Sequence, residues 1–291
     1  MKHIIPISGK DSLATAIVQK KRRPDIEYEY LFNPVGFELP ETLDWLYRVE
    51  GYLGKEIKFV GKDLKTTPEW ISGFRPSQNA RWCTRIGKIL PTEDAFYETG
   101  YIYYGLRADE PERIGYIARG QLTMEPVYPL REQSIGLSEV LQICHQTGLK
   151  PPTFFWQVLK DEFIRRVGED FLYSRFNEWE LDQLFAWRKR NNCYNCFFMA
   201  RYEWVGLLTH HPALFWWQVE EEEKVDQREH AFTTIKDLPL RQLANKKDEI
   251  LERYIVSTSR RLNKLKQLKL FDNNLFNDIL STTSCGLFCG K

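Results

Sequence analysis

The sequence lacks a long hydrophobic run and carries almost no net charge. No apolar stretch approaches the ~20 residues that a membrane-spanning helix needs, so we expect no contact with a membrane. The 41 basic and 40 acidic residues leave a formal charge of +1, which argues against a nucleic-acid coating protein but allows a local basic patch. Met1 and Lys2 lead directly into an apolar stretch without a signal peptide, so we expect a cytoplasmic protein.

Cysteines are few, and cytoplasmic cysteines stay reduced. The six are Cys83, Cys144, Cys193, Cys196, Cys285 and Cys289. The last four form a C-x-x-C and a C-x-x-x-C pair, whose spacing favours metal ligands or reactive thiols over disulfides. Two close pairs allow a four-thiolate site for iron–sulfur or zinc. The plainer alternative for the C-x-x-C pair is two core thiols on a helix.

Strand and helix patterns alternate in the first half of the chain. We expect strands at 3–7, 26–33, 56–60 and 101–106, and helices from residue 13 and at 41–53. This alternation predicts an α/β fold, with a parallel sheet flanked by helices. Right-handed crossovers place the loops after parallel strands along one edge of the sheet. The loops at 8–12, 33–40 and 105–113 should therefore converge on one crevice.

Past Pro151 and Pro152 the strand signals nearly vanish, which predicts a domain at 1–150 and a helical C-terminal domain at 151–291. The expected helices are 155–167, 178–190, 197–209, 213–224 and 241–269. The last of these holds nine Lys or Arg against three acids, either as a solvated face or as a contact with a nucleic-acid backbone. Cys144 and His145 follow an apolar helical pattern and are predicted in the core, and His210 and His211 should cap the helix before Pro212.

The loop Ser8-Gly9-Lys10-Asp11-Ser12 carries the clearest chemistry. A Gly- and Ser-rich turn between a strand and a helix leaves backbone N–H groups unpaired and aimed outward, and the helix dipole adds to this anion site. The spacing is not that of a Walker A loop. Ser8, Gly9 and Ser12 would cradle a phosphate group, with Asp11 as a ligand for the magnesium that accompanies it, directly or through water. The plainer alternative is an ordinary capped turn.

This loop resembles the PP-loop of the adenine-nucleotide alpha-hydrolase superfamily, Ser-Gly-Gly-x-Asp-Ser, of which Gly9 keeps one glycine. Further segments resemble the phosphoadenosine phosphosulfate (PAPS) reductase branch. They are Asn33 to Thr42, Arg81-Trp82-Cys83-Thr84 followed by Lys88, Gly105 to Glu110 with Arg113, and Tyr128-Pro129-Leu130. Asn33-Pro34-Val35 departs from the first residues of that branch's pattern, and Pro111 stands in place of a serine.

The resemblance implies a nucleotide-binding sheet of the PP-loop (HUP) type and an activity that cleaves ATP to AMP and pyrophosphate, with Mg²⁺. The implied nucleotide contacts are Ser8, Gly9, Lys10, Asp11, Ser12, Asn33, Gly36, Lys88, Gly105, Arg107 and Arg113. The implied catalytic residues are Lys10, Asp11, Ser12 and Arg107. Arg107 and Arg113 suit bidentate phosphate binding. Their plainer alternative is a surface salt bridge to Asp109 or Glu110.

The cysteines add sulfur chemistry to this resemblance. Related enzymes that carry a [4Fe–4S] cluster have adjacent cysteines at the segment of Cys83, whereas this chain has Thr84, so a tail cysteine would fill the vacancy. The candidate ligands are Cys83, Cys193, Cys196, Cys285 and Cys289, with zinc as the alternative metal. The combination is similar to the ATP pyrophosphatases of DNA phosphorothioation systems. That similarity implies a cysteine desulfurase as partner and DNA as acceptor, with tRNA or a small molecule as alternatives.

Two rival functions stay open. The tail around Cys285 resembles the Cys-Gly-Leu ending of PAPS reductases, which implies a sulfonucleotide reductase that uses Cys285 as nucleophile together with thioredoxin. The other rival is a non-catalytic nucleotide or nucleic-acid binding subunit of a defence complex.

Overall fold

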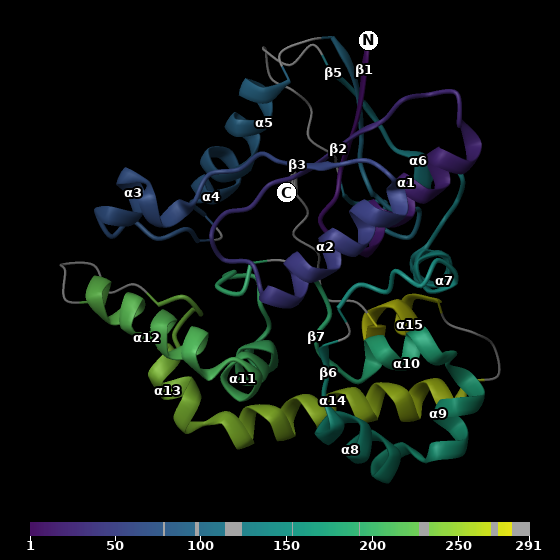
Figure 1. Ribbon diagram of the computed structural model, residues 1–291. Helices are drawn as coiled ribbons and strands as arrows, with labels where there is room; N and C mark the ends of the chain where they lie inside the picture. Colours follow the sequence, from purple (N-terminus) through teal and green to yellow (C-terminus); the bar gives the residue numbers. More distant parts are fainter. Residues whose placement is uncertain are drawn as a thin grey trace.

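A five-stranded parallel sheet forms the centre of the N-terminal half (Figure 1). The computed structural model describes residues 1–77, 79–96, 99–113, 124–152, 154–191, 193–226, 233–268 and 273–280. The strands are β1 (Lys2–Pro6), β2 (Glu29–Phe32), β3 (Ile57–Phe59), β4 (Gly100–Tyr103) and β5 (Met124–Val127). The predicted α/β class is confirmed, and β5 is a strand that the sequence patterns did not predict.

The strand order is β3-β2-β1-β4-β5. β2 and β3 are added in turn on one side of β1, and β4 and β5 are then added on its other side. In the register, Ile4 lies opposite Glu29 of β2 and Ile102 of β4. The gap between β1 and β4 is a topological switch point, where parallel sheets bind ligands outside the carboxyl ends of their strands. The sheet is compatible with a Rossmann-like or HUP-type fold.

Both faces of the sheet are covered, which is why its strands read as apolar runs. The helices on the first half are α1 (Lys10–Arg22), α2 (Pro40–Leu53), α6 (Pro129–Glu132) and α7 (Leu137–Gln146). Ile5 of β1 lies in a core cluster with Leu13 and Trp45, whereas Ile4 faces the other way, toward Phe96. Neighbouring residues of β1 thus pack into two cores, one on each face of the sheet.

Short helical segments fill the connection between β3 and β4. They are η1 (Leu64–Thr66), α3 (Pro68–Ile71), α4 (Trp82–Thr84), the π-helical turn η2 (Arg85–Ile89) and α5 (Leu90–Ala95). A π-helical turn inside a helix often accompanies a functional site. This one brings Lys88 to the same edge of the sheet as the loop after β2, because the Asn33 amide donates to the Lys88 carbonyl at 3.4 Å.

The C-terminal region is helical, with one small antiparallel sheet. Its elements are β6 (Phe154–Phe155), α8 (Gln157–Val167), α9 (Glu169–Arg175), α10 (Glu178–Leu184), β7 (Ala186–Arg188), α11 (Arg201–His210), α12 (Pro212–Asp226), α13 (Leu240–Asn245), α14 (Lys247–Gln267) and α15 (Asn273–Leu280). In Figure 1 this half lies below the sheet, with β6 and β7 among its helices.

The predicted helix at 178–190 is wrong in its second half. It ends at Leu184, and Ala186–Arg188 pairs with β6 instead. Trp187 is 2% exposed, and its ring lies 5.2 Å from that of Phe154, centroid to centroid. Burial of this aromatic pair overrides the helical pattern.

The predicted basic helix at 241–269 is divided into α13 and α14 at Lys246. α14 buries Ile255, Leu262 and Leu265 against the helical half, and its basic side chains Arg260 and Lys264 are exposed. The structure thus gives this helix a packed apolar face and a solvated basic one.

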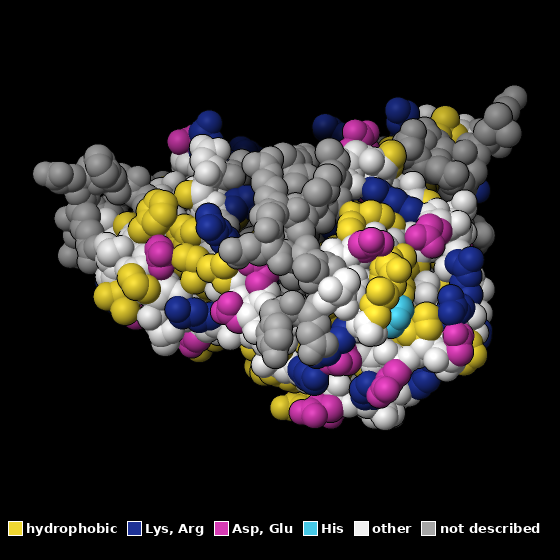
Figure 2. Space-filling view, turned by 90° about the horizontal axis from the view of Figure 1, so that it is seen from above, with side chains coloured by type: hydrophobic (Ala, Val, Ile, Leu, Met, Phe, Trp, Pro, Cys, Tyr) yellow, Lys and Arg dark blue, Asp and Glu magenta, His cyan; other side chains and the backbone are white. Residues whose placement is uncertain are grey.

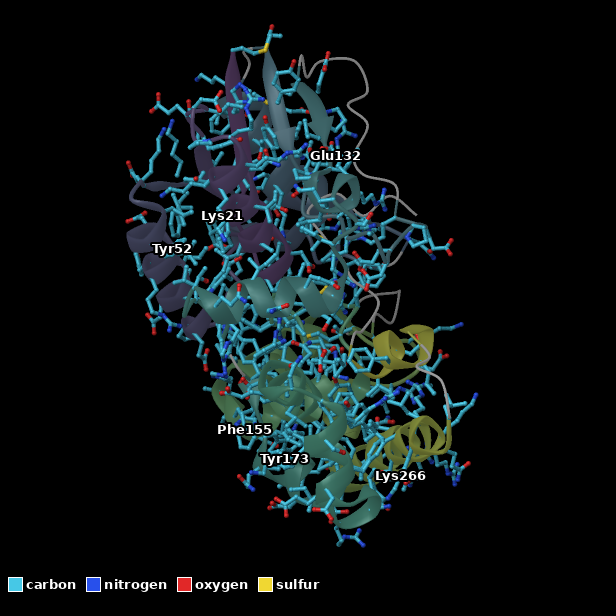
Figure 3. The ribbon with its side chains drawn as sticks, turned by 90° about the vertical axis from the view of Figure 1, so that its right-hand side faces the viewer. Lys21, Tyr52, Glu132, Phe155, Tyr173 and Lys266 are labelled. Carbon is cyan, nitrogen blue, oxygen red and sulfur yellow. The ribbon has the colours of Figure 1, made fainter. Side chains whose placement is uncertain are left out.

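The two halves share a core. Phe37, from the loop after β2, lies 4.9 Å from the Trp70 ring and 5.8 Å from the Trp217 ring of α12, centroid to centroid. A side view shows the halves stacked, with Lys21, Tyr52 and Glu132 on the upper one and Phe155, Tyr173 and Lys266 on the lower one (Figure 3). The carboxyl edge of the sheet is therefore enclosed by the helical half.

The face of the molecule that lies at the top of Figure 1 carries charges of both signs. Seen from above, Lys and Arg side chains alternate with Asp and Glu, with hydrophobic side chains between them (Figure 2). This mixture agrees with the formal charge of +1. Across the described ranges, no helix combines the length and the apolar character that a membrane span requires.

Two glycines provide a matched test of the packing. A Cβ at Gly206 of α11 would lie 2.5 Å from the Trp187 ring, whereas a Cβ at Gly51 of α2 would meet nothing within 4 Å. Gly206→Ala should lower the free energy of unfolding by about 1–3 kcal/mol through overpacking. Gly51→Ala should raise it by about 0.5–1 kcal/mol through helix propensity. Urea unfolding measures both, and a Gly206→Ala midpoint at or above that of the parent would contradict the Trp187 packing.

Candidate functional site

The loop between β1 and α1 is closed by its own serine. The backbone N–H groups of Ser8 and Gly9 donate to Ser12 Oγ at 2.9 and 3.1 Å, and that hydroxyl donates to the Gly9 carbonyl at 2.9 Å. The expectation that these two N–H groups point outward unpaired is therefore wrong, because the Ser12 hydroxyl occupies them. The first-turn N–H groups of α1 have no intrahelical partner, as at any helix N-terminus, and anion binding by them stays a prediction.

The loop after β4 packs directly against the N-terminus of α1. A Cβ on Gly105 would lie 2.7 Å from Ser12 N and 2.7 Å from the Asp11 carbonyl carbon, closer than real side chains approach. Only glycine lets the two loops meet at the switch point. Of the three loops predicted to converge, 8–12 and 105–113 do meet. The hydrogen bonds of Asn33, in the predicted third loop at 33–40, run to Val60, Lys88 and Thr92 instead.

Arg107 connects the same two loops through charge. Its side chain is 4% exposed and contacts three carboxylates: Asp109 Oδ1 at 2.8 Å from Nε, Asp11 Oδ1 at 3.2 Å from Nη1, and Glu110 Oε1 at 3.2 Å from Nη2. The alternative of a surface salt bridge named two of these three partners correctly, Asp109 and Glu110, but the ion pairs are buried and not on the surface. The fork instead spans the switch point in a buried position.

The charge of Arg107 decides the state of Asp11. Burial by itself would raise the pKa of the Asp11 carboxyl, but the positive charges of Arg107 and Lys10 and the hydrogen bond from Arg107 outweigh it. The pKa therefore lies below its usual 3.8, and Asp11 is an anion at neutral pH. An anionic carboxylate with 21% of its surface exposed is a suitable ligand for a hard cation.

Two more arginines hold the loop after β4. Arg113 Nη1 lies 2.6 Å from Glu110 Oε2, and Arg131 donates to the Glu110 carbonyl at 2.6 Å and to the Arg113 carbonyl. Arg113 therefore contacts the carboxylate that Arg107 also contacts. The structure makes one network of the residues that the sequence assigned separately to phosphate.

Asn33 and Gly36 lie in the segment that follows β2, and hydrogen bonds hold both of them. The Asn33 amide is 2% exposed and donates to the Val60 carbonyl and, at 2.9 Å, to Thr92 Oγ1. Gly36 has a φ of 82°, and its N–H donates to Glu38 Oε2 at 2.9 Å. Asn33 thus joins strand ends and α5 from within the core, and the N–H of Gly36 is already satisfied by a carboxylate.

Three cysteines from distant segments lie near enough to one another to affect each other's pKa. Cys83 lies on α4, while Cys193 and Cys196 lie in a turn between β7 and α11, closed by the Cys196 N–H to Cys193 carbonyl bond of 3.2 Å. Burial raises the pKa of Cys193 to about 12, and the neighbouring thiols add to the rise while Lys88 opposes it. Burial, followed by Cys196, likewise raises the pKa of Cys83. The C-x-x-C pair is therefore in a turn, not on a helix.

These three thiols have the donor chemistry of an iron–sulfur or zinc site. Within the described ranges, no three His, Cys, Asp or Glu side chains come close enough together to hold a metal ion. Cys285 and Cys289, the other two predicted ligands, lie outside the described residues. The structure thus brings Cys83 near the C-x-x-C pair but does not group the three thiols as metal ligands, and the metal site stays a prediction.

A segment that the sequence reading missed covers the loop after β1. Lys10 Nζ donates to the Lys189 carbonyl at 3.4 Å, and a Cβ on Gly9 would lie 3.7 Å from Asn191 Cβ. Thr42 Oγ1 also bonds to Asn191 Oδ1. The signal was present in the sequence as the basic triplet Arg188-Lys189-Arg190 just before the C-x-x-C pair.

Cys144 is 1% exposed, as predicted, and the predictions for the histidines hold in part. His145 is not a core residue: its side chain is 31% exposed, and its Nε2 lies 3.3 Å from Glu178. α11 does end at His210, but His210 stacks on Trp187 and His211 Nε2 contacts Glu41 at 2.9 Å.

Searches against protein-family models, curated proteins and solved structures found no match for the chain. Its fold is compatible with a Rossmann-like or HUP-type sheet, and any finer assignment depends on the residues of this crevice.

Replacement of Arg107 tests the three-carboxylate network. A lysine ammonium cannot reach three carboxylates in different directions, so Arg107→Lys should cost about 1.5–3 kcal/mol of unfolding free energy at pH 7, measured in urea. Because the pKa of Asp11 is lowered on folding, its contribution is present above about pH 4 and is lost as the pH falls through the folded value. The difference from the parent should therefore shrink below about pH 4.

The control for this substitution is Arg253→Lys, at an exposed ion pair with Glu249. It should change stability by less than about 0.5 kcal/mol. Equal losses at the two positions would contradict a special role for Arg107.

Proposed function

We propose that the chain is a PP-loop ATP pyrophosphatase, which cleaves ATP to AMP and pyrophosphate and thereby activates an acceptor oxygen for sulfur incorporation. The observation that carries the proposal is the meeting of the Ser8–Ser12 loop with the Gly105–Arg113 loop at the switch point, across a 3.2 Å contact between Arg107 and Asp11. Parallel sheets bind nucleotides at this place.

The residues of the crevice suit a departing pyrophosphate. The N-terminus of α1 offers backbone donors and a positive dipole end. Lys10 adds a point charge at the start of the same helix, and Ser12 holds the loop in its turn. In the proposed reaction the acceptor oxygen forms a bond to the α-phosphorus of ATP, and the bond from that phosphorus to the bridging oxygen breaks, so pyrophosphate leaves with the electron pair.

Asp11 is the residue that would hold magnesium. Its lowered pKa keeps it anionic at neutral pH, and Arg107 fixes its orientation by contacting Oδ1. Bound Mg²⁺ would neutralise charge that develops on the leaving phosphates. Arg107 itself acts through the three carboxylates that it contacts, so we assign it to positioning and not to direct phosphate binding.

The proposed delivery of sulfur rests on Cys83, Cys193 and Cys196. They would hold a [4Fe–4S] cluster together with Cys285 or Cys289, with zinc as the alternative metal. A cluster of this kind supplies electron-transfer or sulfur chemistry. Burial outweighs Lys88 and holds the pKa of Cys83 and Cys193 above the ordinary value, so metal binding would have to displace the protons of these thiols. A cysteine desulfurase would supply sulfur, and DNA is the proposed acceptor.

The ATP assignment is tested with Asp11→Asn, which preserves shape and removes the charge. Release of pyrophosphate from ATP and Mg²⁺, measured with and without duplex DNA, should fall by about 100-fold or more. Pyrophosphate release should fall by a similar factor in Ser12→Ala, because this substitution removes the hydroxyl that closes the loop. The matched control Asp25→Asn alters an exposed aspartate paired with Arg23 and should retain full activity. Circular dichroism verifies folding, and a folded Asp11→Asn protein with parental turnover would refute the assignment.

The metal assignment is tested by elemental analysis of anaerobically purified protein. Iron and acid-labile sulfide should be present in the parent and lost in Cys83→Ser and Cys193→Ser, because each substitution removes a thiolate ligand. Cys144→Ser, at a buried cysteine on α7, should keep the full metal content. Zinc in place of iron would identify a zinc site. A full metal complement in Cys193→Ser would contradict both.

A further inference from the structure

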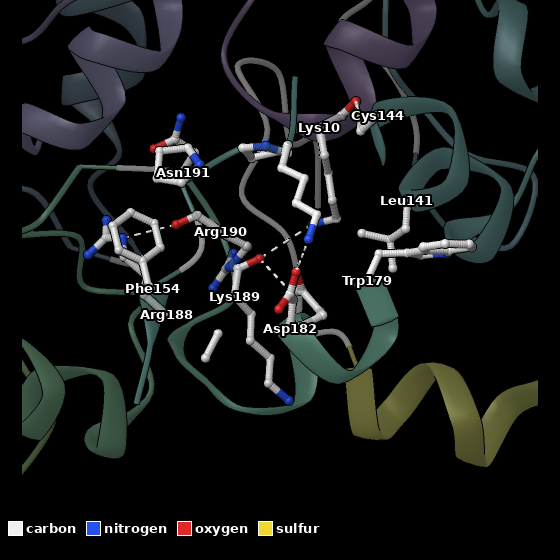
Figure 4. A pocket seen from close by; sticks show the side chains of 15 residues that line it. Lys10, Leu141, Cys144, Phe154, Trp179, Asp182, Arg188, Lys189, Arg190 and Asn191 are labelled. Carbon is white, nitrogen blue, oxygen red and sulfur yellow. Dashed lines mark hydrogen bonds and ion pairs between the residues drawn. The ribbon is translucent and has the colours of Figure 1, made fainter. Parts of the chain in front are cut away.

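A cavity of about 60 Å³ lies where the helical half meets Lys10 (Figure 4). Water needs roughly 10–15 Å³ by this measure, so the space suits several waters or one small oxyanion. Its charged lining consists of Lys10, Lys150, Asp182, Arg188, Lys189 and Arg190. Five of these six are basic, in a chain whose overall charge is +1.

Three of the basic residues already have partners. Lys150 Nζ lies 2.6 Å from Asp182 Oδ2, so this ion pair is locally neutral. Lys189 Nζ donates to the Ile279 carbonyl of α15, and Arg188 Nε donates to the Arg190 carbonyl at 2.9 Å. The carbonyl bonds of Lys189 and Arg188 occupy donors without cancelling charge, so the lining keeps an excess of positive charge outside the Lys150–Asp182 pair.

Arg190 has donors that lack an acceptor. Its Nη2 donates to the Phe198 carbonyl at 3.1 Å, but its Nε and Nη1 are buried and find no hydrogen-bond partner among the described residues. The Asn191 side chain is in the same state, since Oδ1 bonds to Thr42 while Nδ2 is buried and unpartnered. An unsatisfied buried donor costs on the order of 1–3 kcal/mol, and more when it is charged.

Lys10 has a related deficit. Among the described residues its one hydrogen bond is a long one, 3.4 Å to the Lys189 carbonyl. A negative group in the cavity would accept hydrogen bonds from Lys10 and Arg190 together.

We propose that this cavity binds a tetrahedral oxyanion, a phosphate or sulfate group, between Lys10 and the Arg190–Asn191 segment. The remaining walls include Leu141, Phe154 and Trp179, which offer apolar contact and leave little room for a larger polar group. The site shares Lys10 with the proposed pyrophosphate site but differs from the N-terminus of α1, because its donors are side chains. It does not depend on ATP cleavage. The oxyanion is either a free ion or the phosphate of a mononucleotide.

The test is calorimetric titration of the full chain with inorganic phosphate, sulfate and AMP. Phosphate or AMP should bind the parent at least ten times more tightly than Arg190→Gln, because the substitution removes the charged fork. Arg253→Gln, at an exposed pair on α14, should bind like the parent. If phosphate and sulfate bind and AMP does not, the natural ligand is a free oxyanion. If AMP displaces bound phosphate, the ligand is the phosphate group of a nucleotide.

Two further measurements keep the result interpretable. Phosphate should raise the urea midpoint of the parent more than that of Arg190→Gln, which also reports whether the variant folds. The dependence on Arg190 should persist in a Ser12→Ala background, so that failure of the ATP assignment does not imply failure of this one. Oxyanion affinities that are equal in the parent and in a folded Arg190→Gln protein, or no binding to the parent, would overturn the proposal.

Discussion

The buried fork of Arg107 is the constraint on which the crevice depends. It joins Asp11, at the start of α1, to Asp109 and Glu110, in the loop after β4, across the reversal point of the sheet. The contact is possible only because Gly105 lets the second loop lie against the first. With both loops fixed, the helix terminus, the anionic Asp11 and Lys10 share one edge, which the helical half then encloses.

The sequence predicted the strands of the sheet better than it predicted how the helical half covers the carboxyl edge of that sheet. Alternating apolar runs indicated four of its strands, and the loop positions followed from the handedness of parallel crossovers. The β7 strand was missed because Trp187 becomes buried only through its contacts with Phe154 and α11, which lie far away in the chain. The partners of Arg107 were in part foreseeable, since two lie within three residues. Its burial and its contact with Asp11 depend on the tertiary fold.

The same distinction applies to the site. Ser12 was chosen as a donor to an anion, whereas in the structure its hydroxyl accepts the N–H groups of Ser8 and Gly9 and so stabilises the turn. Asn33 was chosen from a motif, and its amide joins strand ends inside the core. Motif resemblance located the right loops. It did not distinguish side chains that face a ligand from those that build the loop.

The six residues from Arg188 to Cys193 connect features that the fold would otherwise keep apart. Asn191 touches the Gly9 region, and Cys193 is two positions further along the chain. Two residues of fully extended backbone span at most about 7 Å. The turn that holds the cysteines is therefore linked to the first loop of the sheet by a very short stretch of chain. A movement of Cys193 beyond the reach of these two residues must draw Asn191 away from Gly9.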